Sequence, residues 1–439
     1  MGTILFRSAR RAQKTAVSSL RGKYTPPPDK SITHRALFLA ALAKGTSQIK
    51  NPLATGDCLS TLNALQKLGV SIRKGRGIWT VKGKGGLQSN SRRTIDCGNS
   101  GTTIRLLTGI LSSQGVEAVL SGDSSLKKRP MKRVIEPLRK MGAKITAHKD
   151  NFAPIRIHKD SSLRGITWGS PIASAQVKTA LLLAGLSASG KTTVIEPAKS
   201  RDHTERMLKG LGVKVGVEGN RVTVTGGAAL KGFNISVPGD FSSASFFIVA
   251  ALIVPGSHLI LRNVNLNPTR TGLLTVLKKM GAKIKVLRIS NKDFEPVGDL
   301  DVRHSMLKGT RVSGAQIPLL IDEIPILAVA ASQARGKTIV KGALELRVKE
   351  SDRIAAIVSE LKKMGANIKE RLDGFTVTGP SSLRGAPADS RGDHRMAMAL
   401  AVAGLVAAGK TKIKDFSCTR VSYPGFVNDL ASLLHPKPR

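Results

Sequence analysis

The chain has 439 residues, of which 70 are Lys or Arg and 29 are Asp or Glu, so its net charge is +41 at pH 7. Its apolar content of 41% is typical of an ordered globular protein, and its longest apolar runs are too short to span a membrane. Nucleic-acid binding is not favoured as the main function, because only 3% of the residues are aromatic and the basic residues are scattered.

The N-terminus is basic. The first 23 residues contain six basic residues and no acid, a composition also found in organelle transit peptides. Little sequence precedes the first predicted strand, so we favour a short disordered basic arm over residues 1–15. Three cysteines without paired spacing, Cys58, Cys97 and Cys418, indicate a reducing compartment, and we expect a cytoplasmic protein.

One pattern then occurs six times along the chain. An apolar helical stretch begins on polar or charged residues and ends at a glycine that precedes a predicted strand. These stretches cover residues 30–45, 98–115, 174–190, 242–256, 322–336 and 394–409. A spacing of 66 to 80 residues between the final glycines is too long for a common solenoid and suits a repeated α/β unit.

A second helix belongs to the same repeated unit. It combines Leu or Met at helical spacing with a basic last turn and a stop glycine. The copies cover residues 62–70, 134–143, 206–213, 276–282 and 358–366, with a degenerate sixth copy at 427–435. We therefore predict an α/β (α+β type) fold in which six units divide into two lobes of three.

Two segments, 185–192 and 404–411, match the formal pattern of a phosphate-binding loop. That motif requires a strand before the loop and a helix after it. Here a predicted helix precedes each segment and a predicted strand follows. We therefore interpret both segments as helix C-caps and reject nucleotide binding there.

Polar and charged residues gather at the starts of the predicted helices, where free N–H groups and the helix dipole suit anions. Capping or a solvated charged face would explain each group taken alone. The candidates are Lys30, Ser31, Arg35, Asn99, Gly101, Thr102, Arg129, Ser174, Ala175, Gln176, Ser200, Arg201, Asp322, Lys349, Glu350, Arg353 and Arg395. If the helices of each lobe run parallel, these groups suit a pair of substrates with several negative charges, which arginine forks bind well.

Nine motifs resemble those of the 5-enolpyruvylshikimate-3-phosphate (EPSP) synthase family. They are PPDKSITHR, GNSGTTIR, LKKRPMKR, ASAQVK, SRDHTE, NPTRTG, IDEIPILA, RVKESDR and DHRMAM, and the likeness covers roughly residues 16–432. It is greatest to the bacterial branch that includes glyphosate-tolerant members. However, Gly101 stands where an alanine accompanies tolerance in some relatives.

The resemblance implies a two-lobed enolpyruvyl transferase fold of six βαβαββ repeats. The N-terminal lobe would comprise residues 28–240, and the C-terminal lobe residues 16–27 and 241–439. The implied reaction transfers enolpyruvyl from phosphoenolpyruvate to the 5-hydroxyl of shikimate 3-phosphate by addition and elimination, and it releases phosphate. The resemblance implies no cofactor and no metal; we also expect a monomer and no membrane partner.

Site roles follow from the resemblance, motif by motif. Shikimate 3-phosphate would be bound by Lys30, Ser31, Arg35, Ser174, Ala175, Gln176, Ser200, Arg201, Asp322 and Lys349. Phosphoenolpyruvate would be bound by Lys30, Asn99, Gly101, Thr102, Arg129, Gln176, Arg353 and Arg395. Asp322, Glu350 and Lys30 would be catalytic, with Asp322 as the base for the 5-hydroxyl.

The chain departs from the family pattern near its C-terminus. Many members have a lysine at the position of Val421, and Arg420 lies beside it here. Two alternatives remain open: the sister enzyme that transfers enolpyruvyl to UDP-N-acetylglucosamine, and a protein that binds nucleic acid or another polyanion. The sister enzyme usually carries a cysteine or aspartate near the place of Arg129, whereas the three cysteines lie elsewhere.

Overall fold

The computed structural model describes residues 4–7, 19–87, 93–159 and 162–434. The chain divides into two compact units. Unit 1 consists of Met1–Pro27, Gly239–Ser290 and Pro296–Arg439, and unit 2 of Pro28–Pro238 and Asn291–Glu295. Of the predicted basic arm, Ile4–Arg7 form strand β1 and pair with Lys410–Ile413. The rest of the arm lies outside the described residues.

Unit 2 contains three four-stranded sheets of one design. Their strand orders are β14-β3-β5-β4, β6-β7-β9-β8 and β10-β11-β13-β12. In each sheet the first edge strand runs parallel to its neighbour, and the other pairs are antiparallel. The strands are β3 (Lys44–Lys50), β4 (Ser71–Gly75), β5 (Ile78–Lys84), β6 (Arg93–Asp96), β7 (Ala118–Ser121), β8 (Ile145–His148), β9 (Phe152–Ile157), β10 (Thr167–Gly169), β11 (Lys191–Ile195), β12 (Val215–Glu218), β13 (Arg221–Thr225) and β14 (Asn234–Ser236).

Unit 1 repeats the design in the orders β16-β17-β15-β2 and β18-β19-β21-β20, with a shorter sheet β1-β23-β22. Its further strands are β2 (Arg21–Tyr24), β15 (His258–Asn265), β16 (Lys283–Lys292), β17 (Glu295–Arg303), β18 (Arg311–Val312), β19 (Gly336–Val340), β20 (Asn367–Arg371), β21 (Gly374–Gly379), β22 (Pro387–Asp389) and β23 (Lys410–Lys414). The predicted α/β architecture with a repeated unit is confirmed.

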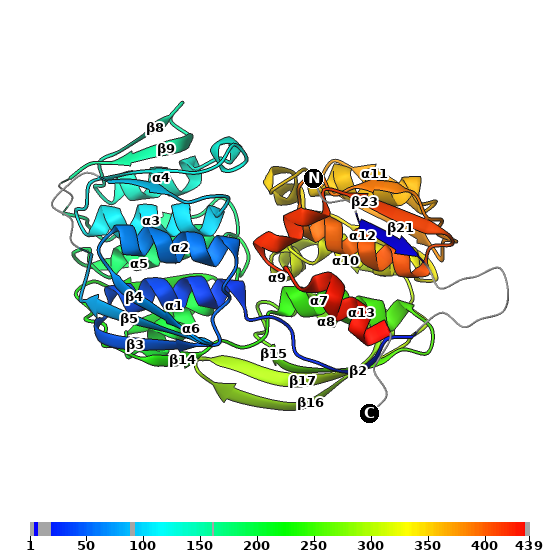
Figure 1. Ribbon diagram of the computed structural model, residues 1–439. Coiled ribbons are helices and arrows are strands. Elements are labelled where there is room, and N and C mark those ends of the chain that lie inside the picture. Colours follow the sequence, from blue (N-terminus) through cyan, green and yellow to red (C-terminus); the bar gives the residue numbers. More distant parts are fainter. Residues whose placement is uncertain (1–3, 8–18, 88–92, 160–161, 435–439) are drawn as a thin grey trace. The chain divides into compact units, whose positions relative to one another are not determined.

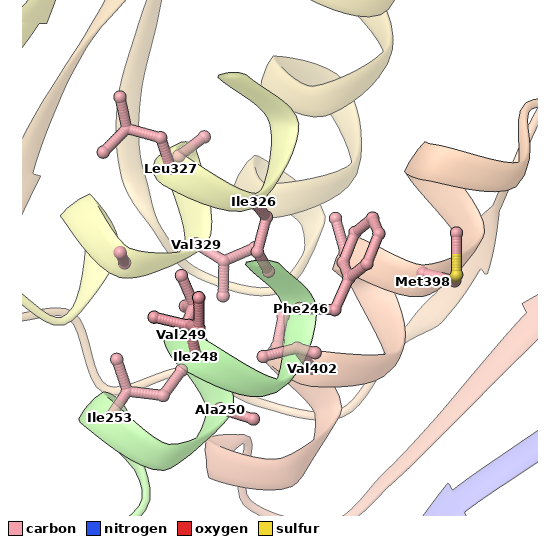
Figure 2. Close-up of a cluster of buried hydrophobic side chains, with 14 of the residues drawn as sticks. Phe246, Ile248, Val249, Ala250, Ile253, Ile326, Leu327, Val329, Met398 and Val402 are labelled. Atoms are coloured by element: carbon pink, nitrogen blue, oxygen red, sulfur yellow. The ribbon is translucent and has the colours of Figure 1, made fainter. Parts of the chain in front are cut away.

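Six apolar helices, one from each repeat, form the cores and are called the core helices here. They are α1 (Lys30–Leu42), α3 (Gly101–Ser113) and α5 (Ala175–Gly185) in unit 2, and α7 (Phe241–Ile253), α10 (Ile324–Ser332) and α12 (His394–Val406) in unit 1 (Figure 1). Every residue of α7 is buried. A helix that is apolar on all sides is stable only inside a core. Figure 2 shows Phe246 and Val249 of α7 in one cluster with Val329 of α10 and Val402 of α12.

The second helix of each repeat is amphipathic and packs outside the core helices. This second set comprises α2 (Gly56–Lys67), α4 (Lys132–Lys140), α6 (His203–Gly210), α8 (Gly272–Lys279), α11 (Arg353–Lys363) and α13 (Phe426–Leu434). Short helices η1 (Leu126–Lys128), η2 (Gly314–Gln316), α9 (Ile317–Leu320), η3 (Leu344–Val348) and η4 (Phe416–Val421) lie in the connections. Within the described residues no single helix could span a membrane. One bent pair, Gly314–Leu320 with Ile324–Ser332, could do so by length and composition only.

The stop glycines that the sequence analysis identified have positive φ, for example Gly45 at 111° and Gly365 at 89°. Such backbone favours glycine. The interpretation of 185–192 and 404–411 as helix C-caps is confirmed, because the segments contain the C-cap residues Leu186 of α5 and Ala407 of α12. Helix α5 ends at Gly185 and α12 at Val406, so Gly190 and Gly409 lie in the turns that lead into β11 and β23. In both segments the helix precedes and the strand follows.

A Leu-Lys/Arg-Gly triplet precedes the parallel edge strand of four sheets. It occurs at residues 163–165, 230–232, 307–309 and 383–385, and its leucine is buried each time. The backbone of the triplet packs against a strand of the sheet. At Gly165 an added Cβ would lie 2.2 Å from the Lys191 carbonyl oxygen. Only glycine permits that approach.

Candidate active site

Helix α1 of unit 2 begins with a capped turn that carries the first predicted cation. The Asp29 carboxylate accepts a hydrogen bond from the Ile32 N–H at 3.0 Å. Lys30 follows, and its Nζ lies 3.0 Å from Asp57 Oδ2 of α2. The Lys30 side chain keeps 18% of its exposure, and Ser31 beside it is half-buried. The ammonium is therefore oriented by one carboxylate and remains accessible to an anion at the helix N-terminus.

Arg35 lies deeper than the sequence analysis expected of a ligand-binding cation, with 3% exposure. Its Nε donates to Thr204 Oγ1 and its Nη2 to Thr179 Oγ1, both at 2.8 Å. Its Nη1 donates to the Ser31 carbonyl at 3.1 Å. Burial lowers the pKa of Arg35 to about 10, against the opposing effect of Glu205. The guanidinium therefore stays charged at neutral pH and joins α1, α5 and α6.

The starts of α3 and α5 meet through Gln176. Its Nε2 donates to Thr102 Oγ1 at 2.9 Å, and its Oε1 accepts from Arg105 Nη1 at 2.7 Å. An added Cβ on Gly101 would lie 2.7 Å from that Arg105 nitrogen and 3.4 Å from Arg129 Nη1. The sequence analysis missed Arg105, although it follows Gly101 by four residues and therefore shares its helix face.

Arg129 is held by the loop before α3. Its Nη2 donates to Asn99 Oδ1 at 2.6 Å and to Ser125 Oγ at 3.2 Å. The Asn99 Nδ2 in turn donates to Asp123 Oδ2 at 2.6 Å. Asn99 and Arg129 thus lie beside Gly101, in contact with the α3–α5 group just described. Five residues that the resemblance assigned to phosphoenolpyruvate lie together, namely Asn99, Gly101, Thr102, Arg129 and Gln176.

The predicted residues around Ser174 and Ser200 are brought together by a buried carboxylate. Ser174 caps α5, its Oγ accepting from the Val177 N–H at 3.4 Å, and Ala175 is the first helical residue. The N–H groups of Ser174 and Ser200 donate to the two oxygens of Glu196, at 3.0 and 3.3 Å. Arg201, half-buried, follows Ser200. The sequence analysis did not single out Glu196.

In unit 1 the buried Arg353 guanidinium is surrounded by carboxylates. Its Nη2 lies 2.6 Å from Glu350 Oε2, its Nη1 3.1 Å from Asp322 Oδ1, and its Nε 2.7 Å from Asp393 Oδ2. Burial opposes the charge, but Asp393, Glu350 and Asp322 outweigh it and raise the pKa of Arg353. The sequence analysis predicted Asp322, Glu350 and Arg353 but missed Asp393, which precedes α12 and caps it.

Arg395 and Lys349 complete this group. Arg395 Nη2 lies 3.5 Å from Asp322 Oδ2, and Nη1 lies 3.9 Å from Glu323 Oε1. Burial lowers the pKa of the Lys349 ammonium, and the nearby Arg353 acts in the same direction, whereas Asp322 opposes them. The unit 1 charge set therefore holds four carboxylates and three cations: Asp322, Glu323, Lys349, Glu350, Arg353, Asp393 and Arg395.

Two further residues of the quoted motifs and of the C-terminal region are placed as follows. The His203 Nδ1 lies 2.7 Å from Glu295 Oε1, and both side chains are fully buried. Arg420 is exposed on η4. In the part of the chain that the structure describes, no three His, Cys, Asp or Glu residues are placed to hold a metal ion.

The two units carry different chemistry. Unit 2 offers cations at helix N-termini, from Lys30, Arg105, Arg129 and Arg201, which suit phosphate and carboxylate groups. Unit 1 offers carboxylates held in fixed positions by Arg353, which suit proton transfer.

Comparison with known proteins identifies what the chain resembles. Residues 14–430 match the sequence pattern of EPSP synthase (3-phosphoshikimate 1-carboxyvinyltransferase). The 3-phosphoshikimate 1-carboxyvinyltransferase of Carboxydothermus hydrogenoformans is 53% identical over 95% of this chain and 98% of its own length. That of Thermodesulfovibrio yellowstonii is 52% identical over 94% and 97%.

Comparison with solved structures shows the same likeness. The EPSP synthase of Acinetobacter baumannii is 41% identical and superposes with a TM-score of 0.86 over 98% of each chain. The enolpyruvyl transferase NikO of Streptomyces tendae superposes with a TM-score of 0.75 over 98% of this chain and 97% of its own, at 17% identity. At that identity the likeness concerns the fold alone, which is that of the enolpyruvyl transferases.

Proposed function

The chain belongs to the EPSP synthase family and is a 3-phosphoshikimate 1-carboxyvinyltransferase, and from this premise we propose which of its residues carry each step. Its substrates are phosphoenolpyruvate and shikimate 3-phosphate. The proposal assigns binding of the anionic groups mainly to unit 2, and proton transfer mainly to unit 1 with a contribution from Lys30 of unit 2. The observation that carries it is the pair of carboxylates, Asp322 and Glu350, held 3.1 and 2.6 Å from one guanidinium.

We assign shikimate 3-phosphate to residues at the starts of α1, α5 and α6 and to two residues of unit 1. These are Lys30, Ser31, Arg35, Ser174, Ala175, Gln176, Ser200, Arg201, Asp322 and Lys349. Of these, Arg35 acts largely by holding α1, α5 and α6 together, since its hydrogen bonds to Thr204, Ser31 and Thr179 all go to protein oxygens. Helix N-termini and arginine forks together suit a phosphate group.

We assign phosphoenolpyruvate to Lys30, Asn99, Gly101, Thr102, Arg129, Gln176, Arg353 and Arg395. Arg105 joins this group by its contact with Gln176. Gly101 has no side chain, so the ligand can approach the start of α3 between the two guanidinium groups.

The reaction begins with addition. The 5-hydroxyl oxygen of shikimate 3-phosphate forms a bond to C2 of phosphoenolpyruvate, Asp322 accepts the hydroxyl proton, and C3 gains a proton to become a methyl group. Glu350 in its protonated form, with Lys30, supplies that proton and becomes a carboxylate. The product is a tetrahedral adduct that carries both phosphate groups.

Elimination reverses the proton movement at C3. Glu350 removes a proton from the methyl group, the C2–C3 double bond re-forms, and the C2–O bond to phosphate breaks. Lys30 donates a proton to the departing phosphate, and exchange with solvent then reprotonates Lys30 and deprotonates Asp322. The same carboxyl group thus gives and takes a proton at one carbon, which requires it to be held close to that carbon.

Two finer assignments belong to this proposal. We propose that the protein acts as a monomer. We also propose membership of the bacterial branch with glyphosate-tolerant members, on the motifs quoted above, although Gly101 lacks the methyl group found in some of those relatives. Glyphosate inhibition measured at several phosphoenolpyruvate concentrations would test the second, and sedimentation of the protein the first.

The first experiment measures phosphate release from phosphoenolpyruvate with and without shikimate 3-phosphate. We expect release only when both are present. UDP-N-acetylglucosamine serves as a control acceptor. Release with the UDP-sugar but not with shikimate 3-phosphate would overturn the assignment.

A further inference from the structure

Glu196 is a buried carboxylate that contacts two separate substrate-binding segments of unit 2. It follows β11 directly, and its side chain is 2% exposed. Its Oε1 accepts from the Ser174 N–H at the start of α5, at 3.0 Å. Its Oε2 accepts from the Ser200 N–H just before α6, at 3.3 Å. One side chain therefore sets the spacing between two segments that are 26 residues apart in sequence.

The carboxylate is itself held by a buried lysine. Lys178 Nζ lies 2.7 Å from Glu196 Oε2 and 2.7 Å from Glu205 Oε1, and it donates to the Ser200 carbonyl at 3.4 Å. Burial disfavours its charge, but Glu205 and Glu196 outweigh burial and raise the pKa of Lys178. The lysine is thus charged at neutral pH. Ser200 is fixed at both its N–H and its carbonyl by this group.

The Ser200 hydroxyl, unlike the Ser200 backbone, is not held by this group. Its Oγ is buried and makes no hydrogen bond to the described residues. A buried hydroxyl without a partner is costly unless a ligand or a water satisfies it. The backbone of Ser200 is therefore rigidly placed while its hydroxyl is left available.

We propose that Glu196 is a positioning residue for the acceptor substrate. It holds Ser174 and Ser200 at the separation that lets both contact one anionic group, and Lys178 keeps the Glu196 carboxylate oriented. The inference rests on the function proposed above, since the group to be bound is the phosphate of shikimate 3-phosphate. Phosphoenolpyruvate, assigned mainly to the starts of α1 and α3, depends on this spacing much less.

A cavity is lined by the same residues and makes a second test possible. Its volume is about 270 Å³, and Lys178, Glu196 and Glu205 are among its lining residues. Its lining also includes the exposed residues Lys199, Lys209 and Asn220, so it opens to solvent. A small carboxylate could therefore reach the place of a deleted Glu196 side chain.

The first test compares Glu196→Gln with Glu205→Gln. Both variants remove a carboxylate that lies 2.7 Å from Lys178 Nζ, so both should lower the melting temperature to a similar extent. Of the two residues, only Glu196 bonds to the Ser174 and Ser200 N–H groups. An amide at position 196 presents an NH₂ group to one of those donors, which breaks the shared contact.

We expect Glu196→Gln to raise the Kd of shikimate 3-phosphate by roughly tenfold or more, the effect of losing about one hydrogen bond to a charged group. The KM of phosphoenolpyruvate should change much less, and Glu205→Gln should leave the Kd near the wild-type value. Equal losses of affinity in both variants would reduce Glu196 to a stabilising residue and overturn the inference.

Two further variants keep the inference falsifiable if Glu196→Gln does not fold. Glu196→Asp keeps the charge that Lys178 requires but is one methylene too short to reach both N–H groups, so it should fold and still bind shikimate 3-phosphate weakly. Wild-type affinity in Glu196→Asp would contradict the inference. Glu196→Ala should regain affinity in sodium acetate but not in sodium chloride, and no regain would count against it.

Titration of the wild-type and variant proteins with shikimate 3-phosphate separates this inference from the proposed function. A wild-type protein that does not bind shikimate 3-phosphate would overturn both. Wild-type binding with unchanged affinity in Glu196→Gln would overturn only the role of Glu196.

Discussion

At the scale of single residues, Arg353 shows how a cation can position carboxylates for proton transfer as well as bind substrate charge. Its guanidinium is buried and hydrogen-bonded to Asp322, Glu350 and Asp393. Breaking one of these contacts would leave a buried charge poorly compensated, which is strongly unfavourable. Arg353 therefore fixes the two proposed catalytic carboxylates relative to each other, in addition to the phosphoenolpyruvate contact assigned to it.

Replacement of the proposed base should separate turnover from binding. We expect Asp322→Asn to lower kcat by about 10²–10⁴-fold, the usual contribution of a general base. The amide oxygen can still accept from Arg353, so the Kd values of both substrates should change far less. Turnover is measured by phosphate release and binding by calorimetry.

The matched control is Asp352→Asn. Asp352 lies in the segment of Glu350 and Arg353, caps α11 and pairs with Arg347, and in the described structure its carboxylate makes no hydrogen bond or ion pair with the Arg353 guanidinium. Asn is as good a helix cap as Asp, so kcat should stay near the wild-type value. Near-normal kcat in Asp322→Asn would remove Asp322 as the base.

The charged residues themselves could be predicted from the sequence because they recur at the starts of the repeated helices. Their partners could not. Asp393 is 40 residues from Arg353, and Arg105 is 71 residues from Gln176. Such pairs form only when separate repeats pack together, and no local pattern records that packing. Arg105 alone had a local signal, its spacing from Gly101.

At the scale of elements, the apolar periodicity and the stop glycines locate the helices within a few residues of their ends. The parallel edge strands were not predictable in the same way. For example, the backbone of Lys231 forms a parallel bridge with that of Lys44, although almost the whole sequence of unit 2 separates the two residues. The Leu-Lys/Arg-Gly triplet precedes these strands in the sequence. It could not be used to predict them, because its glycine is required only by the close approach of a strand that is distant in sequence.

This close approach can be tested at two neighbouring glycines. Gly165→Ala would place a Cβ 2.2 Å from the Lys191 carbonyl oxygen, and backbone cannot move aside cheaply. We expect a loss of about 1–3 kcal/mol in the free energy of unfolding, typical of overpacking. Gly169→Ala is the control, because its Cβ would meet no atom within 4 Å. Similar urea midpoints for both variants would show that the triplet glycine is dispensable.

The helix α1 carries a buried histidine that should make stability depend on pH. His34 is fully buried, and its Nδ1 lies 2.7 Å from Thr61 Oγ1 of α2. Burial lowers the pKa of His34 from 6.5 to about 3, with Lys30 and Arg35 acting in the same direction and Asp57 opposing them. Below pH 6.5 the unfolded chain binds a proton that the folded chain does not, so stability falls with pH down to about 3.

The expected slope is about 1.4 kcal/mol per pH unit for this one group. His34→Gln keeps a hydrogen-bonding side chain but cannot titrate. The free energy of unfolding, measured in urea from pH 8 to pH 4, should therefore fall less steeply in His34→Gln than in the wild type. Parallel curves for the two proteins would mean that other groups cause the acid sensitivity.

At the scale of the whole molecule, the net charge of +41 is the feature that the enzyme's site does not explain. The site uses only a few of the 70 basic residues, and lysines and arginines are spread over the sheets and the second set of helices. A surface of this kind binds polyanions such as nucleic acid without sequence preference, and that binding is driven by counterion release.

Salt should therefore separate the surface from the site. Binding of a labelled oligonucleotide should weaken by about 10³-fold or more between 50 and 200 mM KCl if the protein contacts six or more phosphates. Turnover at saturating substrates should persist over the same range, because buried or partly buried ion pairs such as Lys30–Asp57 and Arg353–Asp322 are screened much less. Polarisation of the labelled oligonucleotide and phosphate release, measured in the same buffers, give the two curves. If turnover at saturating substrates fell as steeply as oligonucleotide binding, the ion pairs of the site would be as sensitive to salt as the surface charge, and the separation of surface from site would be wrong.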